Sequence, residues 1–329
     1  MVSFASNDYL GLSVHPDVMS AAHDAIDRWG TGATASRLVV GTRPCHAHLE
    51  EALASWLAVD AALVLPTGYA ANLAVLTTFG APDTTILSDA WNHASIIDGC
   101  RLSRARVEVF EHHDLDHLER LLARVGGRSV VVTDTVFSMD GDVADVVRLG
   151  ELCARHGALL VLDEAHAVLG PAVPDELDAE ILRVGTLSKS LGSLGGFVAD
   201  PRALDDLVVN RARPFIFSTG LSPADVAAAS AALAVVASDE GQQLRQRLRD
   251  HVHRLVPGHP SPIVPVIVGD ERDAVDASTA LLERGLLVPA IRPPTVPPGT
   301  SRLRITPSAA HDDADLDRLI EALERLALR

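Results

Sequence analysis

The chain has 329 residues, of which 47% are hydrophobic and 22% charged, so its composition is that of a globular protein and not of a disordered one. Its 28 basic and 44 acidic residues leave a formal net charge of −16. This excess of acid argues against a surface whose main task is to grip nucleic acid or anionic lipid.

Helices and strands are expected to alternate along the first part of the chain. Proline at position 16 suits the first turn of a helix, and apolar residues spaced three and four apart mark the later helices. In chain order we expect helices over 15–28, 45–57, 69–79, 94–102, 115–125 and 146–156, and strands over 61–65, 85–87, 106–110, 129–133, 159–162 and 181–186. This alternation of helices with continuous apolar strands predicts an α/β fold, with a mostly parallel sheet flanked by helices.

The sequence pattern changes near Pro201, and from there predicted helices dominate up to about residue 256. We expect a helix over 223–236, strands over 264–268 and 303–305, and a closing helix over 312–327. The sequence therefore predicts an N-terminal segment (1–40), a large domain (41–210) and a smaller C-terminal α+β domain (211–329). The proline-rich stretch 292–298 is too stiff for a helix and is predicted to form a fixed loop.

Cysteine usage and the N-terminus bear on the cellular compartment. The three cysteines are far apart without a CxxC spacing, so they indicate neither a disulfide framework nor a zinc site and favour a reducing cytoplasm. The first residues lack a basic region followed by an apolar core, so we expect no signal peptide. No apolar run approaches the length of a membrane span.

Two polar residues at predicted strand ends carry the strongest chemical signal. Asp163 ends the apolar run 159–162 and is followed closely by His166, while Lys189 stands in a glycine-bounded turn after the strand 181–186. Sheets of this kind bind ligands at the carboxyl ends of their strands. Pyridoxal phosphate is held by an acid that pairs with its pyridinium nitrogen and an amine that forms a Schiff base. The pair therefore predicts a pyridoxal-phosphate site.

Three weaker features each admit two interpretations. The turn at Gly68 and Tyr69 opens a helix, and its free N–H groups suit a phosphate, although an ordinary strand–helix turn would look the same. His93 is either a helix cap or a ring that stacks on an aromatic cofactor. Ser138 either bonds the cofactor or belongs to an acidic, hairpin-like loop.

Arg302 and Arg304 alternate on a predicted strand and so share one face of it. They could line a solvated sheet edge. Arginine is also the preferred bidentate partner of a carboxylate, and an amino-acid substrate carries one. We therefore favour substrate binding for Arg304.

Three further patterns point elsewhere and carry less weight. The stretch 30–35 fits GxGxxA, yet it follows a helix and not a strand. The stretch 163–166 spells a helicase box, but the chain holds no GxxxxGK[ST] loop for nucleotide binding. Adjacent His112 and His113 would face apart on a strand, so we expect surface residues and no metal site.

Taken together, several segments make the chain similar to the α-oxoamine synthases, which are fold-type I pyridoxal-phosphate enzymes. They follow the family order over nearly the whole chain and comprise residues 6–12, 30–41, 48–50, 67–72, 92–95, 137–142, 163–166, 185–189, 292–297 and 302–304. The resemblance implies an aminotransferase-like fold, pyridoxal 5′-phosphate as cofactor and a homodimer with shared active sites.

The resemblance also implies a role for each matching residue. Lys189 would form the Schiff base, Asp163 would pair with the ring nitrogen, His93 would stack on the ring and His166 would bond the ring hydroxyl. The remaining cofactor contacts would be Gly68, Tyr69, Ser138, Thr186 and, across the dimer interface, Thr219. The substrate contacts would be Asn7, Thr295 and Arg304.

The implied reaction is a decarboxylative condensation of an amino acid with an acyl thioester. The loops 214–219 and 292–297 most resemble members that join L-alanine to a pimeloyl thioester in biotin synthesis, with coenzyme A or an acyl carrier protein as the thiol. Glycine-using members, of the 2-amino-3-ketobutyrate ligase or 5-aminolevulinate synthase type, and a cofactor-binding homologue without acyl transfer are the alternatives. The chain begins close to the Asn-Asp-Tyr-Leu-Gly motif and is short after His166, and we expect both departures to affect acyl binding.

Overall fold

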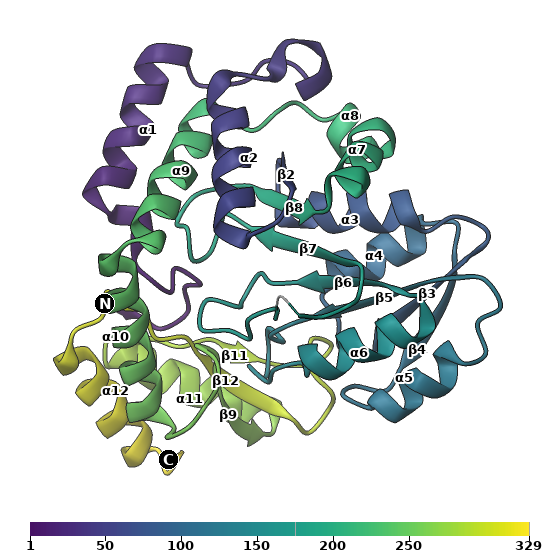
Figure 1. Ribbon diagram of the computed structural model, residues 1–329. Helices are drawn as coiled ribbons and strands as arrows, with labels where there is room; N and C mark the ends of the chain where they lie inside the picture. Colours follow the sequence, from purple (N-terminus) through teal and green to yellow (C-terminus); the bar gives the residue numbers. More distant parts are fainter. Residues whose placement is uncertain (175, 329) are drawn as a thin grey trace.

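The computed structural model describes residues 1–174 and 176–328, apart from the side chains of residues 200, 202, 203 and 205. Within these residues the large domain is built on a seven-stranded sheet with the strand order β2-β8-β7-β6-β5-β3-β4 (Figure 1). The strands are β2 (Ala61–Leu65), β3 (Thr84–Asp89), β4 (Arg106–Phe110), β5 (Arg128–Asp134), β6 (Leu159–Asp163), β7 (Ile181–Thr186) and β8 (Gly196–Asp200).

The run from β7 to β4 is parallel, which confirms the predicted mostly parallel sheet. β8 was not predicted and runs antiparallel to both β7 and β2. Its apolar run is short and begins at Gly196, where an added Cβ would lie 2.5 Å from the Gly68 nitrogen. The close approach of two backbones requires glycine there, and it removes the side chain that would have marked a strand.

Helices cover both faces of this sheet, as the alternation of helices with apolar strands predicted. They are α2 (Pro44–Leu57), α3 (Gly68–Phe79), α4 (Ala94–Leu102), α5 (Leu115–Leu122), α6 (Val146–His156), α7 (Arg202–Arg211) and α8 (Arg213–Ile216). Strand β5 shows the division of the core: Val130 and Val132 pack with α3 and α4 on one face, whereas Val131 packs with α5 and α6 on the other. Successive side chains of a strand point to opposite faces, so a continuous apolar strand feeds both cores.

The small domain holds a three-stranded antiparallel sheet in the order β11-β12-β9, next to three helices (Figure 1). Its elements are α10 (Asp239–Leu255), β9 (Val264–Gly269), α11 (Glu271–Glu283), β10 (Leu286–Leu287), β11 (Ala290–Ile291), β12 (Ser301–Ile305) and α12 (Asp313–Arg325). The N-terminal strand β1 (Val2–Ser3) pairs in parallel with β10, which was not foreseen. The start of the chain is therefore anchored to the small domain, and the domain boundaries drawn from sequence remain predictions.

Helices α1 (Pro16–Trp29) and α9 (Pro223–Ala237), which are far apart in the sequence, lie side by side (Figure 1). All the predicted helices are present, with ends within two or three residues of those expected. Among the described residues, no helix has both the length and the apolar character needed to span a bilayer.

A buried ion pair ties the segment after α1 to the large domain. The Arg37 guanidinium makes two parallel hydrogen bonds to the Glu50 carboxylate, at 2.8 and 2.9 Å. Glu50 also accepts the Val64 N–H of β2 at 2.9 Å, and Arg37 is only 8% exposed. The segment after α1, helix α2 and strand β2 thus meet at one carboxylate.

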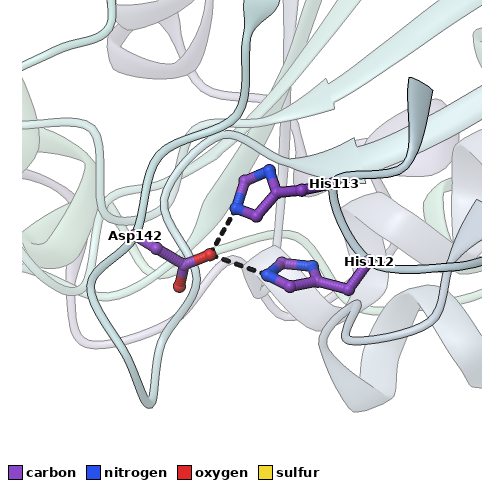
Figure 2. A group of neighbouring side chains, drawn as sticks. All are labelled: His112, His113 and Asp142. Atoms are coloured by element: carbon purple, nitrogen blue, oxygen red, sulfur yellow. Dashed lines mark hydrogen bonds and ion pairs between the residues drawn. The ribbon is translucent and has the colours of Figure 1, made fainter. Parts of the chain in front are cut away.

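The loop 136–143, which carries Ser138, is held by a histidine cluster that corrects an expectation from the sequence. His112 and His113 do not face apart as surface residues of a strand, because they lie in a turn after β4. Both rings point at Asp142, with N···O distances of 2.7 Å from His112 and 2.5 Å from His113 (Figure 2). The second nitrogen of His112 lies 2.9 Å from Asp89, and its ring stacks on Trp91.

Two carboxylates around one imidazole favour its protonated form. Burial opposes the charge, but the hydrogen bonds to Asp142 and Asp89 outweigh it and raise the pKa of His112 to about 9. His112, His113 and Asp142 also place their ligand atoms within 4.8 Å of one another, a spacing at which a metal could be held. The short N···O distances are those of hydrogen bonds, and the absence of a metal here stays a prediction.

Replacing Glu50 by alanine should lower the free energy of unfolding by about 3 kcal/mol, because the Arg37 charge would be left buried without its partner. Chemical denaturation of the purified protein measures this. Glu51→Ala, on the exposed neighbour in the same helix, should change stability by less than about 0.5 kcal/mol. Equal effects of the two variants would contradict the role given to the ion pair.

The histidine cluster predicts a pH dependence of stability. The pKa of His112 is raised in the folded protein, so its contribution is complete below about pH 6.5 and is lost as the pH rises through about 9. Between these limits the wild type should lose about 3 kcal/mol more unfolding free energy than His112→Gln. Urea unfolding at several pH values tests this, and parallel pH profiles for the two proteins would refute it.

Candidate active site

Asp163 lies at the carboxyl end of β6 and is 5% exposed. Asn72, one turn into α3, donates to its Oδ2 at 2.6 Å, and the Ala165 N–H donates to its Oδ1 at 2.9 Å. Donors on both oxygens stabilise the ionised carboxylate. The Asn72 Oδ1 is buried without a hydrogen-bond partner among the described residues. Asn72 was part of a recognised motif, but its contact with Asp163 was not predicted.

Lys189 follows β7 and lies at the same edge of the sheet as Asp163. Its Nζ is 2.8 Å from Nε2 of His166, which is 4% exposed. Burial lowers the pKa of Lys189, partly offset by the negative charges of Asp163 and Asp134, so the neutral amine forms more readily than on a free lysine. Lys189 is also the single lysine of the sequence. The predicted amine and acid therefore lie after neighbouring parallel strands at one edge of the sheet, as the pyridoxal-phosphate hypothesis requires.

His93 opens helix α4 and serves first as its cap. Its ring Nδ1 accepts a hydrogen bond from the Ser95 backbone N–H at 3.2 Å, and the backbone N–H of His93 donates to the Asp134 carboxylate at 2.7 Å. The ring itself is exposed. Ser95 is linked through Asn72 to Asp163. The capping interpretation is therefore correct, and it leaves the ring face free for stacking.

The predicted phosphate residues gather at the start of α3. A Cβ added to Gly68 would lie 3.2 Å from Cβ of Thr186, so the helix start and the end of β7 are in contact. The hydroxyls of Thr186 and Ser188 are 2.6 Å apart; Ser188 was not predicted. The first N–H groups of a helix lack partners within it and attract anions. The Tyr69 hydroxyl is turned away and bonds Asp98, so only the backbone of Tyr69 suits a phosphate.

The two arginines of β12 are not a solvated edge, because Arg302 is 4% and Arg304 6% exposed. Arg302 forms an ion pair with Asp140. Arg304 donates to the backbone oxygen of Ser138 and to Oδ1 of Asn7, but no described carboxylate pairs with it. A buried charge without a counter-charge is costly, so Arg304 is suited to bind an anion.

A hydrogen-bonded chain joins Arg304 to the amine. Asn7 Oδ1 accepts from Arg304 at 3.2 Å and from the Tyr9 hydroxyl at 3.1 Å. The Tyr9 oxygen is 2.6 Å from Nδ1 of His166, whose other nitrogen contacts Lys189. Tyr9 is fully buried and was not predicted as a site residue. Its place in the Asn-Asp-Tyr-Leu-Gly motif was the one signal that could have singled it out.

Three predicted residues lie farther out. Ser138 and Thr295 line a cavity of about 620 Å³ together with Trp91, Ile97 and Phe137. Thr219 is exposed and forms an isolated β-bridge with Ser36, with no recorded contact to the other predicted residues in the described structure. The short segment after His166 lines a second cavity, of about 550 Å³.

These residues fit pyridoxal phosphate. Asp163 offers an acceptor to a pyridinium N–H, the orphaned Asn72 oxygen lies beside it, and Lys189 supplies an amine of lowered pKa. The start of α3 and the hydroxyls of Thr186 and Ser188 offer donors suited to the phosphate group. Each chemical end of the cofactor thus meets a matching group.

Comparison with known proteins agrees with this chemistry. The model of the family "Aminotransferase class I and II" matches residues 1–323. The 8-amino-7-oxononanoate synthases of Anaeromyxobacter dehalogenans (49% identical, 98% of this chain and 85% of the relative) and Geobacter sulfurreducens (47%, 99% and 88%) are similar over nearly their whole length. The first of these alignments spans 343 positions, so this chain of 329 residues lacks at least 14 of them (343 − 329).

Solved structures show the same fold. The serine palmitoyltransferase of Sphingomonas wittichii is 32% identical, with a TM-score of 0.93 over 99% of this chain and 86% of its own. Another serine palmitoyltransferase structure, with bound pyridoxal phosphate, is 31% identical, with a TM-score of 0.94 over 99% and 88%. The chain belongs to the aminotransferase class I and II family and, within it, to the pyridoxal-phosphate-dependent α-oxoamine synthases.

Proposed function

We propose that this enzyme condenses L-alanine with a pimeloyl thioester and releases carbon dioxide and the free thiol to give 8-amino-7-oxononanoate in biotin synthesis. The observation that carries the proposal is Arg304, a buried guanidinium without a carboxylate partner among the described residues, joined through Asn7, Tyr9 and His166 to the amine of Lys189. The carboxylate of an amino acid would supply the missing counter-charge.

Bound pyridoxal phosphate supplies an electron sink for the α-carbon of the amino acid. Asp163 would hold the ring nitrogen protonated. Lys189 would hold the cofactor and then serve as the base for the α-proton, since its lowered pKa favours the neutral amine. His93 would cover the ring face, and Arg304 would orient the substrate carboxylate.

The choice of L-alanine over other amino acids rests on the relatives. The curated relatives named 8-amino-7-oxononanoate synthase are 44–49% identical to this chain, whereas the serine palmitoyltransferase structures are 30–32% identical. A solved 8-amino-7-oxononanoate synthase, from Francisella tularensis, is 24% identical, so the choice rests on the curated relatives. The cavity beside Thr295 is lined by Trp91, Ile97 and Phe137 and would take the apolar part of an acyl chain. Either coenzyme A or an acyl carrier protein could carry the pimeloyl group as the thioester.

A homodimer in the cytoplasm is part of the proposal. Leu38, Val39 and Val40 are exposed and adjoin Thr219 through the Ser36 bridge, and Phe217 is 67% exposed. Clustered exposed apolar side chains are typical of an interface. Such an interface would bring Thr219 to the phosphate held by the partner subunit. The three cysteines form no disulfide in the structure, which suits a reducing compartment.

Lys189 offers a direct test of cofactor attachment. Borohydride reduction of the loaded protein should fix one cofactor per chain on the peptide that contains Lys189, because the sequence has no other lysine. Peptide mass spectrometry reads the position. Lys189→Ala should lose both this label and the visible absorbance of the bound cofactor. A label elsewhere, or an unchanged spectrum in the variant, would remove the assignment.

The substrate is tested by turnover. With pimeloyl-CoA, the wild type should form 8-amino-7-oxononanoate from L-alanine at least tenfold more efficiently than it uses glycine, measured by mass spectrometry of the product. Arg304→Gln should raise KM for L-alanine about 100-fold, since one charged contact is worth about 2–3 kcal/mol.

Arg302→Gln is the matched control, because its guanidinium is engaged by Asp140. It should lower stability and affect KM less than Arg304→Gln. Preference for glycine would support the sister reactions. A spectral response to L-alanine without consumption of thioester would support the homologue that lacks acyl transfer.

A further inference from the structure

We propose that Asn7 and Tyr9 are positioning residues that hold His166 in one tautomer, with the proton on Nδ1 and a free acceptor, Nε2, directed at Lys189. This deepens the proposed function, on which it rests, because the chain of contacts begins at the substrate arginine, Arg304. The hydrogens along this chain are fixed by which atoms can donate and which can only accept.

The first step fixes the amide of Asn7. The guanidinium of Arg304 has N–H donors and no acceptor. Its Nη2 lies 3.2 Å from the Asn7 side-chain amide, so the amide atom that faces it must be the oxygen, Oδ1. Arg304 is held in place by a second bond to the backbone oxygen of Ser138. The orientation of the amide is therefore set by a neighbour that cannot change its role.

The second step fixes the hydroxyl of Tyr9. Its oxygen lies 3.1 Å from the same Oδ1 of Asn7, which can only accept. Tyr9 therefore donates its single proton to Asn7. Burial raises the pKa of Tyr9 well above its usual value in spite of the Arg304 charge, so the phenol keeps that proton. Toward any other partner, the Tyr9 oxygen can act only as an acceptor.

The third step fixes His166. Its Nδ1 lies 2.6 Å from the Tyr9 oxygen, which has no proton left to give, so Nδ1 must carry the hydrogen and donate it. Burial, Lys189 and Arg304 hold the pKa of His166 well below its usual value, so the ring is neutral and Nε2 keeps its lone pair. Nε2 then accepts from Lys189 Nζ at 2.8 Å.

The geometry of this chain is rigid. Tyr9 is fully buried in the main apolar cluster, and its backbone oxygen accepts the Ala309 N–H at 2.8 Å. His166 is 4% exposed, so water does not compete for its nitrogens. With the cofactor bound, His166 would face the ring hydroxyl as an acceptor and not as a donor. Substrate binding at Arg304 and the proton position on His166 are thereby linked.

Side-chain NMR of the cofactor-free protein labelled with ¹⁵N-histidine tests the tautomer, with the His166 signal assigned through its loss in His166→Asn. The wild type should show protonation at Nδ1. Asn7→Ala removes the acceptor, so the Tyr9 proton turns to His166 and the ring should change to the Nε2–H form. Asn7→Asp keeps the acceptor and should keep the wild-type signal.

Tyr9→Phe removes the hydroxyl that accepts from Nδ1 of His166 but keeps the aromatic ring. His166 should then no longer be held in the Nδ1–H tautomer. Asn7 is only partly buried, so its variants serve if Tyr9→Phe does not fold. Tyr69→Phe, at the one other tyrosine, is the control, because its hydroxyl bonds Asp98, and the His166 signal should not move.

In the loaded protein, Tyr9→Phe and Asn7→Ala should shift the pH midpoint of the cofactor absorbance by about one unit, a tenfold change in proton affinity, whereas Asn7→Asp should not. A wild-type His166 protonated at Nε2, or retention of the wild-type Nδ1–H tautomer in both Tyr9→Phe and Asn7→Ala, would overturn the proposal. Because the NMR measurement needs neither cofactor nor substrate, its failure is distinguishable from a failure to use L-alanine.

Discussion

The structure depends on ionisable side chains that are gathered at the carboxyl edge of the sheet and are buried or half-buried there. Asp134, Asp163, Lys189 and Arg304 are brought there by β5, β6, the turn after β7 and β12. Removing charges from water is costly unless they are paired. Asp163 has donors on both oxygens, and its charge partly restores the pKa of Lys189 that burial lowers. Arg304 has no carboxylate partner among the described residues, and in the proposed function the carboxylate of the substrate would supply one.

Three separate parts of the chain supply this edge, and each is anchored elsewhere. Asn7 and Tyr9 follow strand β1, which pairs with β10, so the small domain fixes their position. The loop 136–143 is held by His112 on one side and by Arg302 on the other. Gly141 in that loop has φ of 69°, and a Cβ there would lie 2.0 Å from the Ile263 backbone oxygen. Only glycine permits this contact between the domains. The site is therefore assembled by tertiary contacts and not by any single motif.

Sequence reasoning found the chemistry where the local pattern determined the place. Asp163 and Lys189 follow apolar strands of a parallel sheet, and such strands end at one edge. The roles of His93 and Thr186 needed the family resemblance, because a capping histidine and a strand-end threonine are common. Tyr9 was missed because a tyrosine followed by a leucine is easily taken for a core residue, and its partner His166 is 157 residues away. His112 and His113 were misjudged because the strand was assumed to continue through them. The same lack of long-range information left the β-bridge between Ser36 and Thr219 unforeseen, whereas β8 was missed because its apolar run is short and begins at Gly196.

A crystal structure of the protein with its cofactor tests the central claim most directly. The account predicts a single pyridine ring whose nitrogen lies within hydrogen-bond distance of the Asp163 carboxylate and whose aldehyde carbon is bonded to Nζ of Lys189. A ring nitrogen turned away from Asp163, or a cofactor bound at another edge of the sheet, would contradict it.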